Sequence, residues 1–220
     1  GVAIDLNITT AQNTGGGGID TIRNIERVDS TDFADLLIGN ASDNNFSAGA
    51  GNDTIYGGGG NDRIYAGFGD GGTTNYFDGG NGNDILVGGG DNDTLTGGAG
   101  ADVFRWELVN RGPAGTPAVD TIADFSTAQG DKLDLRDLLQ GETLDGGAIG
   151  NLGNYLFVEK SGADTVVHIS SNGGFTSGYN SGAEDQTIVL AGVDLTASST
   201  LTSQQVIQDL LNNNRLTIDP

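Results

Sequence analysis

Residues 79–105 read GGNGNDILV GGGDNDTLT GGAGADVFR when they are written in groups of nine. Each group opens with glycine, has aspartate at its sixth position and has a large apolar residue at its eighth. A strict period of this length is typical of a solenoid, in which one repeat is too small to bury its own apolar face and stacks on its neighbours. The stretch therefore predicts a stack of coils, with two repeats to a coil.

The same template extends towards the N-terminus. Further repeats begin at Ser30, Gly39, Ala48, Gly57 and Ala66. The repeat from Ala66 is interrupted by the extra residues 71–74, the repeat from Ser30 is degenerate, and an isolated match begins at Gly15. The eighth positions are all apolar, which predicts that they point into a core. They are Leu37, Phe46, Ile55, Ile64, Phe77, Leu86, Leu95 and Phe104.

The residue types predict the shape of one repeat. Glycine permits backbone conformations with positive φ, so six residues form a turn, and the next three form a short strand that pairs with the coils on either side. Asp91 replaces glycine at a fourth position, where aspartate is better tolerated than most residues. We expect an all-β chain: a right-handed parallel β-roll with a β-rich C-terminal cap that contains one or two short helices.

The sixth positions predict a metal site, because each carries a side-chain oxygen. Alternate turns fall on the same edge of the roll, which gives two columns of these side chains. The first ladder is Asn44, Asp62, Asp84 and Asp102, and the second ladder is Asp35, Asp53, Asn75 and Asp93. Carboxylates one coil apart repel without a cation, and carboxylate plus carbonyl oxygens suit Ca²⁺ better than zinc or copper, whereas Mg²⁺ prefers tighter geometry. Gly-Asn-Asp strings are also simple turn formers, but eight turns in register favour calcium.

The pattern resembles the RTX repeat proteins, whose nonapeptides form a calcium-binding β-roll; the match covers residues 30–105. The resemblance implies up to about six Ca²⁺ ions, each held between same-edge turns by the sixth-position side chains and by carbonyls of the first four positions. Asp62, Asp84 and Asp102 are the strongest candidates, and Asp70 or Asp78 is an alternative to Asn75. The implied carbonyl ligands belong to Gly49, Gly51, Gly57, Gly58, Gly59, Gly60, Gly67, Gly69, Gly79, Gly80, Asn81, Gly82, Gly88, Gly89, Gly90, Asp91, Gly97, Gly98, Ala99 and Gly100.

Composition limits the partners. The net charge of −21, from 30 acidic and nine basic residues, disfavours nucleic acid and anionic lipid. Cysteine is absent, which excludes disulfides and thiolate chemistry, and no apolar run is long enough to span a membrane. Because the chain starts at Gly1, contains no methionine and has no visible signal peptide, we expect a piece of a larger protein. We also expect the chain to be monomeric.

The flanks divide the chain into three parts. Residues 1–29 contain strand patterns that should continue the roll and cap its N-terminal end, with Asp20 as a candidate metal ligand. Residues 30–105 are the roll, and residues 106–220 form the cap. In the cap we expect a hairpin that turns near Gly162, and a helix over 202–213 with Thr202 or Ser203 as its N-cap.

Four segments of the cap resemble the C-terminal type I secretion domain of large RTX adhesins. They are DTIADF from Asp120, GDKLDLRDLL from Gly130, DQTIVLAGVDL from Asp185 and the final apolar and acidic tail. The resemblance implies an uncleaved signal that an ABC exporter reads transiently, and a secreted or bacterial cell-surface location. The alternative is the export tail of a secreted RTX hydrolase, protease, epimerase or toxin. Isolated acids of this region are further candidate ligands for an extra ion: Asp120, Asp124, Asp131 and Asp134.

The sequence does not indicate an enzyme. The single histidine, His168, lies in a predicted strand, and no serine lies in a G-x-S-x-G elbow. The repeat accounts for the paired carboxylates as metal ligands. We therefore expect a non-catalytic calcium-binding module with no catalytic residue.

Overall fold

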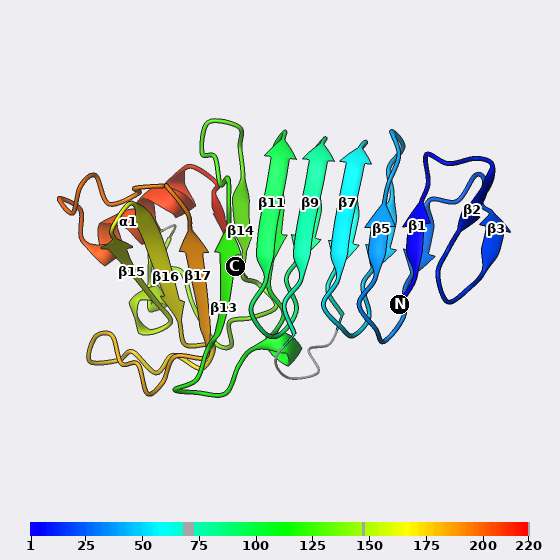
Figure 1. The fold of residues 1–220 in the computed structure, drawn as a ribbon. Coiled ribbons are helices and arrows are strands. Elements are labelled where there is room, and N and C mark those ends of the chain that lie inside the picture. The colour runs from blue at the N-terminus through cyan, green and yellow to red at the C-terminus, as the bar shows by residue number, and fades with distance from the viewer. Residues whose placement is uncertain (68–72, 147, 220) are drawn as a thin grey trace.

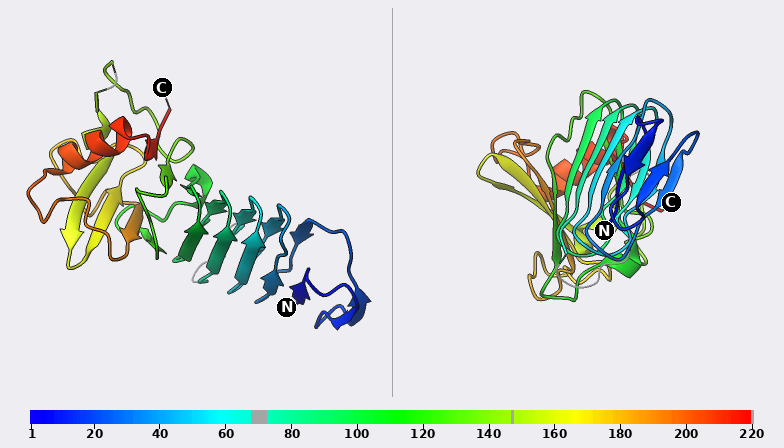
Figure 2. Two further views of the ribbon diagram at one scale, coloured as in Figure 1. Left: turned by 90° about the horizontal axis from the view of Figure 1, so that it is seen from above. Right: turned by 45° about the vertical axis from the view of Figure 1, so that its right-hand side comes forward.

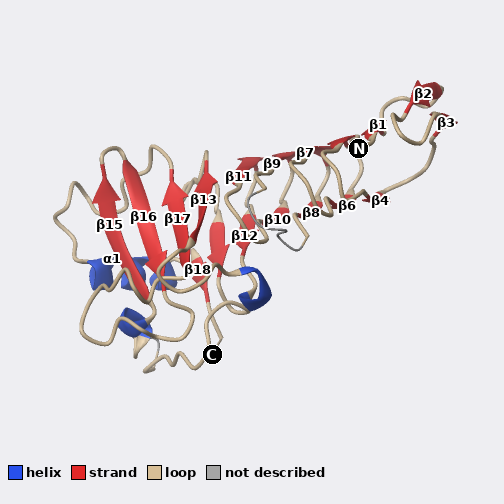
Figure 3. Ribbon diagram, turned by 60° about the horizontal axis from the view of Figure 1, so that its bottom comes forward, coloured by secondary structure: helices blue, strands red, loops and turns tan. Residues whose placement is uncertain are grey.

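The roll consists of two parallel sheets that face each other across an apolar core (Figures 1 and 3). The computed structural model describes residues 1–67, 73–146 and 148–219. The first sheet contains, in order, β1 (Ala3–Asp5), β5 (Leu36–Ile38), β7 (Thr54–Gly59), β9 (Tyr76–Asn81), β11 (Thr94–Ala99), β13 (Ala118–Ile122), β17 (Gln186–Leu190), β16 (Asp164–Ile169) and β15 (Leu156–Ser161). The second contains β18 (Leu216–Thr217), β14 (Lys132–Asp134), β12 (Val103–Arg105), β10 (Ile85–Val87), β8 (Arg63–Tyr65), β6 (Asn45–Ser47) and β4 (Arg27–Asp29).

The register of the strands follows the nine-residue period. In the first sheet Leu37, Ile55, Phe77 and Leu95 lie side by side, and in the second sheet Phe46, Ile64, Leu86 and Phe104 do the same. All eight side chains have 0% exposure, as the eighth-position pattern predicts. Burial of a side chain of this size stabilises the fold by about 1.5–3 kcal/mol. These two rows of side chains are therefore the main apolar contribution to the stability of the roll. The β-roll and the nearly all-β fold are confirmed.

Two details differ from the expected geometry. β7, β9 and β11 are six residues long, because the backbone of the following glycine turn also pairs in register, as Gly58 with Gly80 shows. The coil that holds the interrupted repeat is longer than its neighbours: 22 residues separate Asp53 from Asn75, against 18 between Asp35 and Asp53. Predicted ligand Gly69 and its neighbour Asp70 lie outside the described residues.

The cap extends both sheets of the roll. β13 pairs in parallel with β17, and β16 and β15 continue the sheet as an antiparallel hairpin; β14 pairs with β18. The helix α1 (Ser203–Asn212) packs on β15 and buries Val206, Ile207 and Leu210. Thr202 is its N-cap, in a capping box with Gln205, so the first of the two predicted caps is the one used. Two short 3₁₀ helices, Leu108–Asn110 and Leu152–Asn154, lie in the loops.

The N-terminal flank continues the roll only in part. β1 and β4 join the two sheets, but β2 (Ala11–Asn13) and β3 (Ile19–Thr21) pair only with each other, in a hairpin at the far end of the elongated molecule (Figure 2). The isolated match from Gly15 is therefore not a rung of the roll. Asp20, on β3, accepts a hydrogen bond from the Thr14 hydroxyl at 2.7 Å and lies outside both ladders. In the residues described, no helix has the length and apolar character needed to cross a membrane.

Candidate metal centre

The sixth-position side chains form two continuous columns, each held by the backbone. In the first ladder the backbone N–H groups of Asn44, Asp62 and Asp84 donate to the Oδ1 atoms of Asp62, Asp84 and Asp102, at 2.6, 2.7 and 2.8 Å. In the second ladder the backbone N–H groups of Asp35, Asp53 and Asn75 donate to the Oδ1 atoms of Asp53, Asn75 and Asp93, at 2.8, 2.9 and 2.8 Å. Each side chain thus reaches back to the preceding coil, which aligns the carboxylates along both edges.

Four of the ladder aspartates have a second carboxylate oxygen that no donor in the described part of the chain reaches. The Oδ2 atoms of Asp62, Asp84, Asp93 and Asp102 are buried and have no hydrogen-bond partner among the described residues. Burial raises the pKa of Asp62 and Asp84 to about 6. Burial, with repulsion from Asp120 and Asp131 respectively, raises the pKa of Asp93 to about 8 and of Asp102 to about 7. A buried acceptor without a donor costs about 1–3 kcal/mol, which a bound cation would remove.

The first-position glycines leave room for a cation beside these oxygens. A Cβ atom added to Gly79 would lie 2.4 Å from Asp84 Oδ2 and 2.7 Å from the carbonyl oxygen of Gly97. A Cβ on Gly57 would lie 2.4 Å from Asp62 Oδ2 and 2.5 Å from the carbonyl oxygen of Gly79. Carboxylate and carbonyl oxygens from two successive coils therefore converge on one small volume, and hard oxygen donors of this kind fit Ca²⁺.

Side chains alone do not complete such a site. Within residues 1–67, 73–146 and 148–219, no group of three or more His, Cys, Asp and Glu side chains is arranged to hold a metal. The turn carbonyls must supply the remaining ligands. The fourth-position glycines stack so closely that a Cβ on Gly82 would lie 1.6 Å from the carbonyl oxygen of Gly60. At the same position of its own turn Asp91 has a φ of 69°, as predicted.

The candidate sites at the N-terminal end of each ladder differ from the inner ones. Asp35 accepts hydrogen bonds on both oxygens, from Val2, Ser30 and Thr31; burial acts to raise the pKa of Asp35, but these bonds outweigh it and lower the pKa. Asn44 accepts the Asn40 N–H, and its buried Nδ2 group finds no acceptor in the part of the chain that the structure describes. An Nδ2 group is not a metal ligand. Both positions are therefore poorer candidate calcium ligands than the inner aspartates.

Of the two alternatives to Asn75, Asp78 does not take its place in the second ladder. Asn75 keeps its ladder position, since its N–H donates to Asp93 and its Oδ1 accepts from Asp53. Asp78 lies within β9, beyond the turn that ends at Asn75, and its charge acts on Asp84 of the first ladder.

A third column, at the fifth positions, was missed by the sequence analysis. The N–H groups of Asn61, Asn83 and Ala101 donate to the Oδ1 atoms of Asp43, Asn61 and Asn83, at 2.6, 2.9 and 2.8 Å. The recurrent Asn-Asp dipeptides of the repeats could have indicated this fifth-position column. The asparagine holds successive turns together, and the aspartate after it faces the candidate cation position.

Both ladders also continue into the cap. The Asp93 N–H donates to Asp120 Oδ1 at 2.8 Å, and the Asp102 N–H donates to Asp131 Oδ1 at 3.1 Å. Each of these acids is followed two residues later by a fully buried apolar residue, Ile122 or Leu133, as in the repeats. This Asp-x-apolar spacing would have found them. Asp124 accepts the N–H groups of Gly97 and Gly98, and Asp134 binds Arg105 and Arg136.

His168 lies on the outer face of the cap sheet, far in sequence from the ladders. Its Nδ1 is 2.6 Å from Glu184 Oε1 and its Nε2 is 3.3 Å from Glu159 Oε1. The ring packs beside Tyr179, with centroids 4.5 Å apart, and the Tyr179 hydroxyl donates to Glu184. These contacts hold the loop that contains Tyr179 against the sheet.

Comparison with known proteins agrees with the repeat. The family of the RTX calcium-binding nonapeptide repeat matches residues 38–73 and 70–104, so this part of the chain consists of RTX calcium-binding repeats. The fold is similar to the AlgE6R3 subunit of the Azotobacter vinelandii mannuronan C5-epimerase, with 23% identity over 82% of this chain and 78% of that one and a TM-score of 0.41. It is also similar to the AlgE6R2 subunit, with 26% identity, coverage of 77% and 89%, and a TM-score of 0.38. No curated protein sequence matches the chain significantly.

Proposed function

We propose that this chain is a non-catalytic module that folds when its turns bind several calcium ions, up to about six. The observation that carries the proposal is the pair of buried Oδ2 atoms of Asp62 and Asp84, which have no donor among the described residues. Each lies beside a first-position glycine where a carbonyl oxygen of the next coil also converges. The best sites lie between the turns that end at Asp62 and Asp84, and at Asp84 and Asp102. There the ladder hydrogen bonds are 2.7 and 2.8 Å long and all three carboxylates are buried.

Calcium binding of ordinary strength is sufficient to control folding. Extracellular calcium modules bind with dissociation constants of about 10⁻⁴–10⁻³ M. At free calcium tenfold above that constant, each site adds about 1.4 kcal/mol, so six sites add about 8 kcal/mol. This is comparable to the whole stability of a typical domain. With a net charge of −21 and many glycines, the chain should stay unfolded where calcium is scarce and fold where it is plentiful.

We further propose that residues 106–220 act as the type I secretion region of a large adhesin, read transiently by an ABC exporter. The support is the likeness of the segments beginning at Asp120, Gly130 and Asp185 to that domain. A calcium-dependent fold suits this route, because the chain would cross unfolded and fold on the secreted or cell-surface side. The cap would emerge first, meet calcium first and begin the roll.

Two experiments test the proposal. Calcium titration with counting of bound ions, followed by far-UV circular dichroism, should show several ions binding as the β signal appears. Deletion of residues 202–220 should abolish export, and unchanged export would rule out the secretion role. The export tail of an enzyme or toxin remains the alternative. Sequence upstream of Gly1 separates the two, because tandem extender domains indicate an adhesin and a catalytic domain indicates an enzyme.

A further inference from the structure

The last turn of each ladder differs from the inner turns in one respect: its carboxylate is fully hydrogen-bonded. In the second ladder, Asp120 Oδ2 accepts from the indole Nε1 of Trp106 at 2.6 Å and from the Nε2 group of Gln186 at 2.9 Å. All three side chains are buried, with exposures of 0%, 1% and 0%. The inner Asp93, one coil earlier, has no donor at its Oδ2 within residues 1–67, 73–146 and 148–219.

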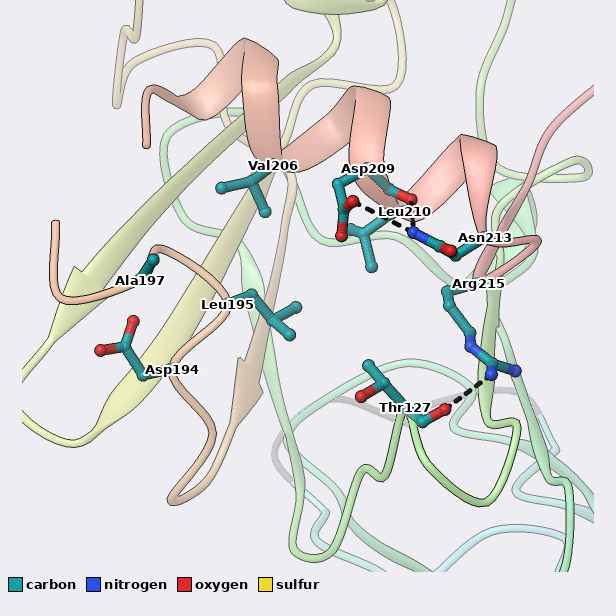
Figure 4. Close-up of a pocket in the computed structure, with 9 residues that line it drawn as sticks. All are labelled: Thr127, Asp194, Leu195, Ala197, Val206, Asp209, Leu210, Asn213 and Arg215. Carbon is teal, nitrogen blue, oxygen red and sulfur yellow. Dashed lines mark hydrogen bonds between the residues drawn. The ribbon is translucent and has the colours of Figure 1, made fainter. Parts of the chain in front are cut away.

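The first ladder ends in the same way but with a charged group. Asp131 Oδ2 accepts the backbone N–H of Ser126 at 2.7 Å. Ser126 is the first residue of this six-residue turn, so its side chain stands where the inner turns have glycine. The Arg215 guanidinium donates to the Thr127 carbonyl at 2.6 Å (Figure 4), and it also attracts the Asp131 carboxylate.

We propose that side chains and backbone of the cap replace calcium at the last turn of both ladders. Trp106 and Gln186 do so at Asp120. At Asp131 the N–H of Ser126 satisfies the carboxylate, and Arg215 acts as a tethered cation that binds a turn carbonyl of the kind that holds calcium in the inner turns. The inference rests on the proposed calcium sites of residues 30–105, and it states where they stop.

The physical argument is a comparison of what an ion would gain. At the turns of Asp84 and Asp93 the ion satisfies an Oδ2 atom that has no hydrogen-bond partner among the described residues. At Asp120 or Asp131 it would have to displace hydrogen bonds that already satisfy the carboxylate, and at Asp131 it would also be repelled by Arg215. Trp106 and Ser126 are only 14 and 5 residues from their acids, but the other two replacing groups come from far along the chain. Gln186 is 66 residues from Asp120, and Arg215 is 88 residues from Thr127. They form these contacts only when the cap is folded, so they join the cap to the roll without metal.

The direct test is an anomalous difference map of wild-type crystals grown in saturating calcium or soaked in a lanthanide. We expect peaks between inner turns, such as those ending at Asp62, Asp84 and Asp102, and none at ligand distance from the Oδ2 atoms of Asp120 or Asp131. Calcium ligands lie at about 2.3–2.6 Å, so the two outcomes are well separated. A peak on either acid would overturn the inference. A roll without any peak would overturn the proposed calcium sites, and the inference with them.

Three matched variants give the same test in solution, by counting bound calcium per folded molecule. Asp84→Asn should lose at least one ion, whereas Asp120→Asn and Asp131→Asn should keep the wild-type number. Loss of an ion from Asp120→Asn or Asp131→Asn, equal to that from Asp84→Asn, contradicts the inference. If all three variants keep the wild-type number, the proposed sites themselves are wrong. The crystallographic result decides the question if a variant fails to fold, because it uses the wild-type chain.

Discussion

Substitution of a single first-position glycine tests where the cation lies. Gly79→Ala adds one methyl group to the volume on which Asp84 Oδ2 and the Gly97 carbonyl oxygen converge. The new Cβ would lie 2.4 and 2.7 Å from these atoms, and contacts below 3.0 Å essentially never occur. Both oxygens would have to move away. The φ of Gly79 is not in the left-handed region, so the effect is steric rather than conformational.

The expected magnitude combines two contributions. Overpacking of a close-packed site costs about 1–3 kcal/mol. Loss of one calcium ion removes about 1.4 kcal/mol more, at free calcium tenfold above the dissociation constant. We therefore expect Gly79→Ala to lower the free energy of unfolding by about 2–4 kcal/mol in calcium and to bind at least one ion fewer.

Gly59→Ala is the matched control. Gly59 lies in the same kind of turn, but a Cβ there would meet nothing closer than 3.8 Å. We expect it to keep the wild-type ion count, with a change in stability within about 0.5 kcal/mol. Equilibrium dialysis with elemental analysis gives the count, and urea unfolding at fixed calcium gives the stability. If Gly79→Ala binds as many ions as Gly59→Ala, the cation does not occupy the volume beside the first-position glycine.

Other perturbations separate the remaining parts of the structure. Burial raises the pKa of Asp102 to about 7 and of Asp93 to about 8 in the calcium-free fold, whereas an unfolded aspartate titrates near 3.8. The calcium-free fold is therefore most stable below about pH 4 and loses stability as the pH rises towards 8. Calcium affinity rises over the same range, because the carboxylates lose their protons. Calcium titrations at about pH 5 and about pH 8 should therefore show weaker binding at the lower pH. Asn61→Ala removes the acceptor of the Asn83 N–H and should cost about 1 kcal/mol in urea unfolding without changing the ion count. Thr202→Ala removes the N-cap of α1 and should cost about 1 kcal/mol, measured as a lower thermal midpoint with unchanged calcium affinity.

The roll was predictable because one physical constraint repeats in register. The eighth residue of every nine-residue repeat has to be apolar, and the backbone of every turn has to pack against the backbone of the next coil. The period alone therefore predicts the two sheets and the core. The helix after Thr202 was also readable from local signals. The strand order of the cap was not, because the pairing of β13 with β17 and of β14 with β18 joins segments that are distant along the chain.

The residues of the two ladders were predictable from the sequence, but the groups that end the ladders were not. The sixth-position pattern gives the ladders, whereas the donors that close them, Trp106, Gln186 and Arg215, follow no pattern and reach Asp120 and Thr127 only through the tertiary fold. Asp78 is the ninth residue of its repeat and lies in β9 between Tyr56 and Thr96, outside the sixth-position column. These contacts depend on which segments meet in space, which one sequence does not show.

The most direct measurement is the far-UV circular dichroism of the intact chain at neutral pH, first in excess chelator and then during calcium titration, with bound ions counted at the end point. The account predicts that the β signal of the roll is absent in chelator and returns cooperatively as several ions bind. An identical β spectrum in excess chelator would contradict it.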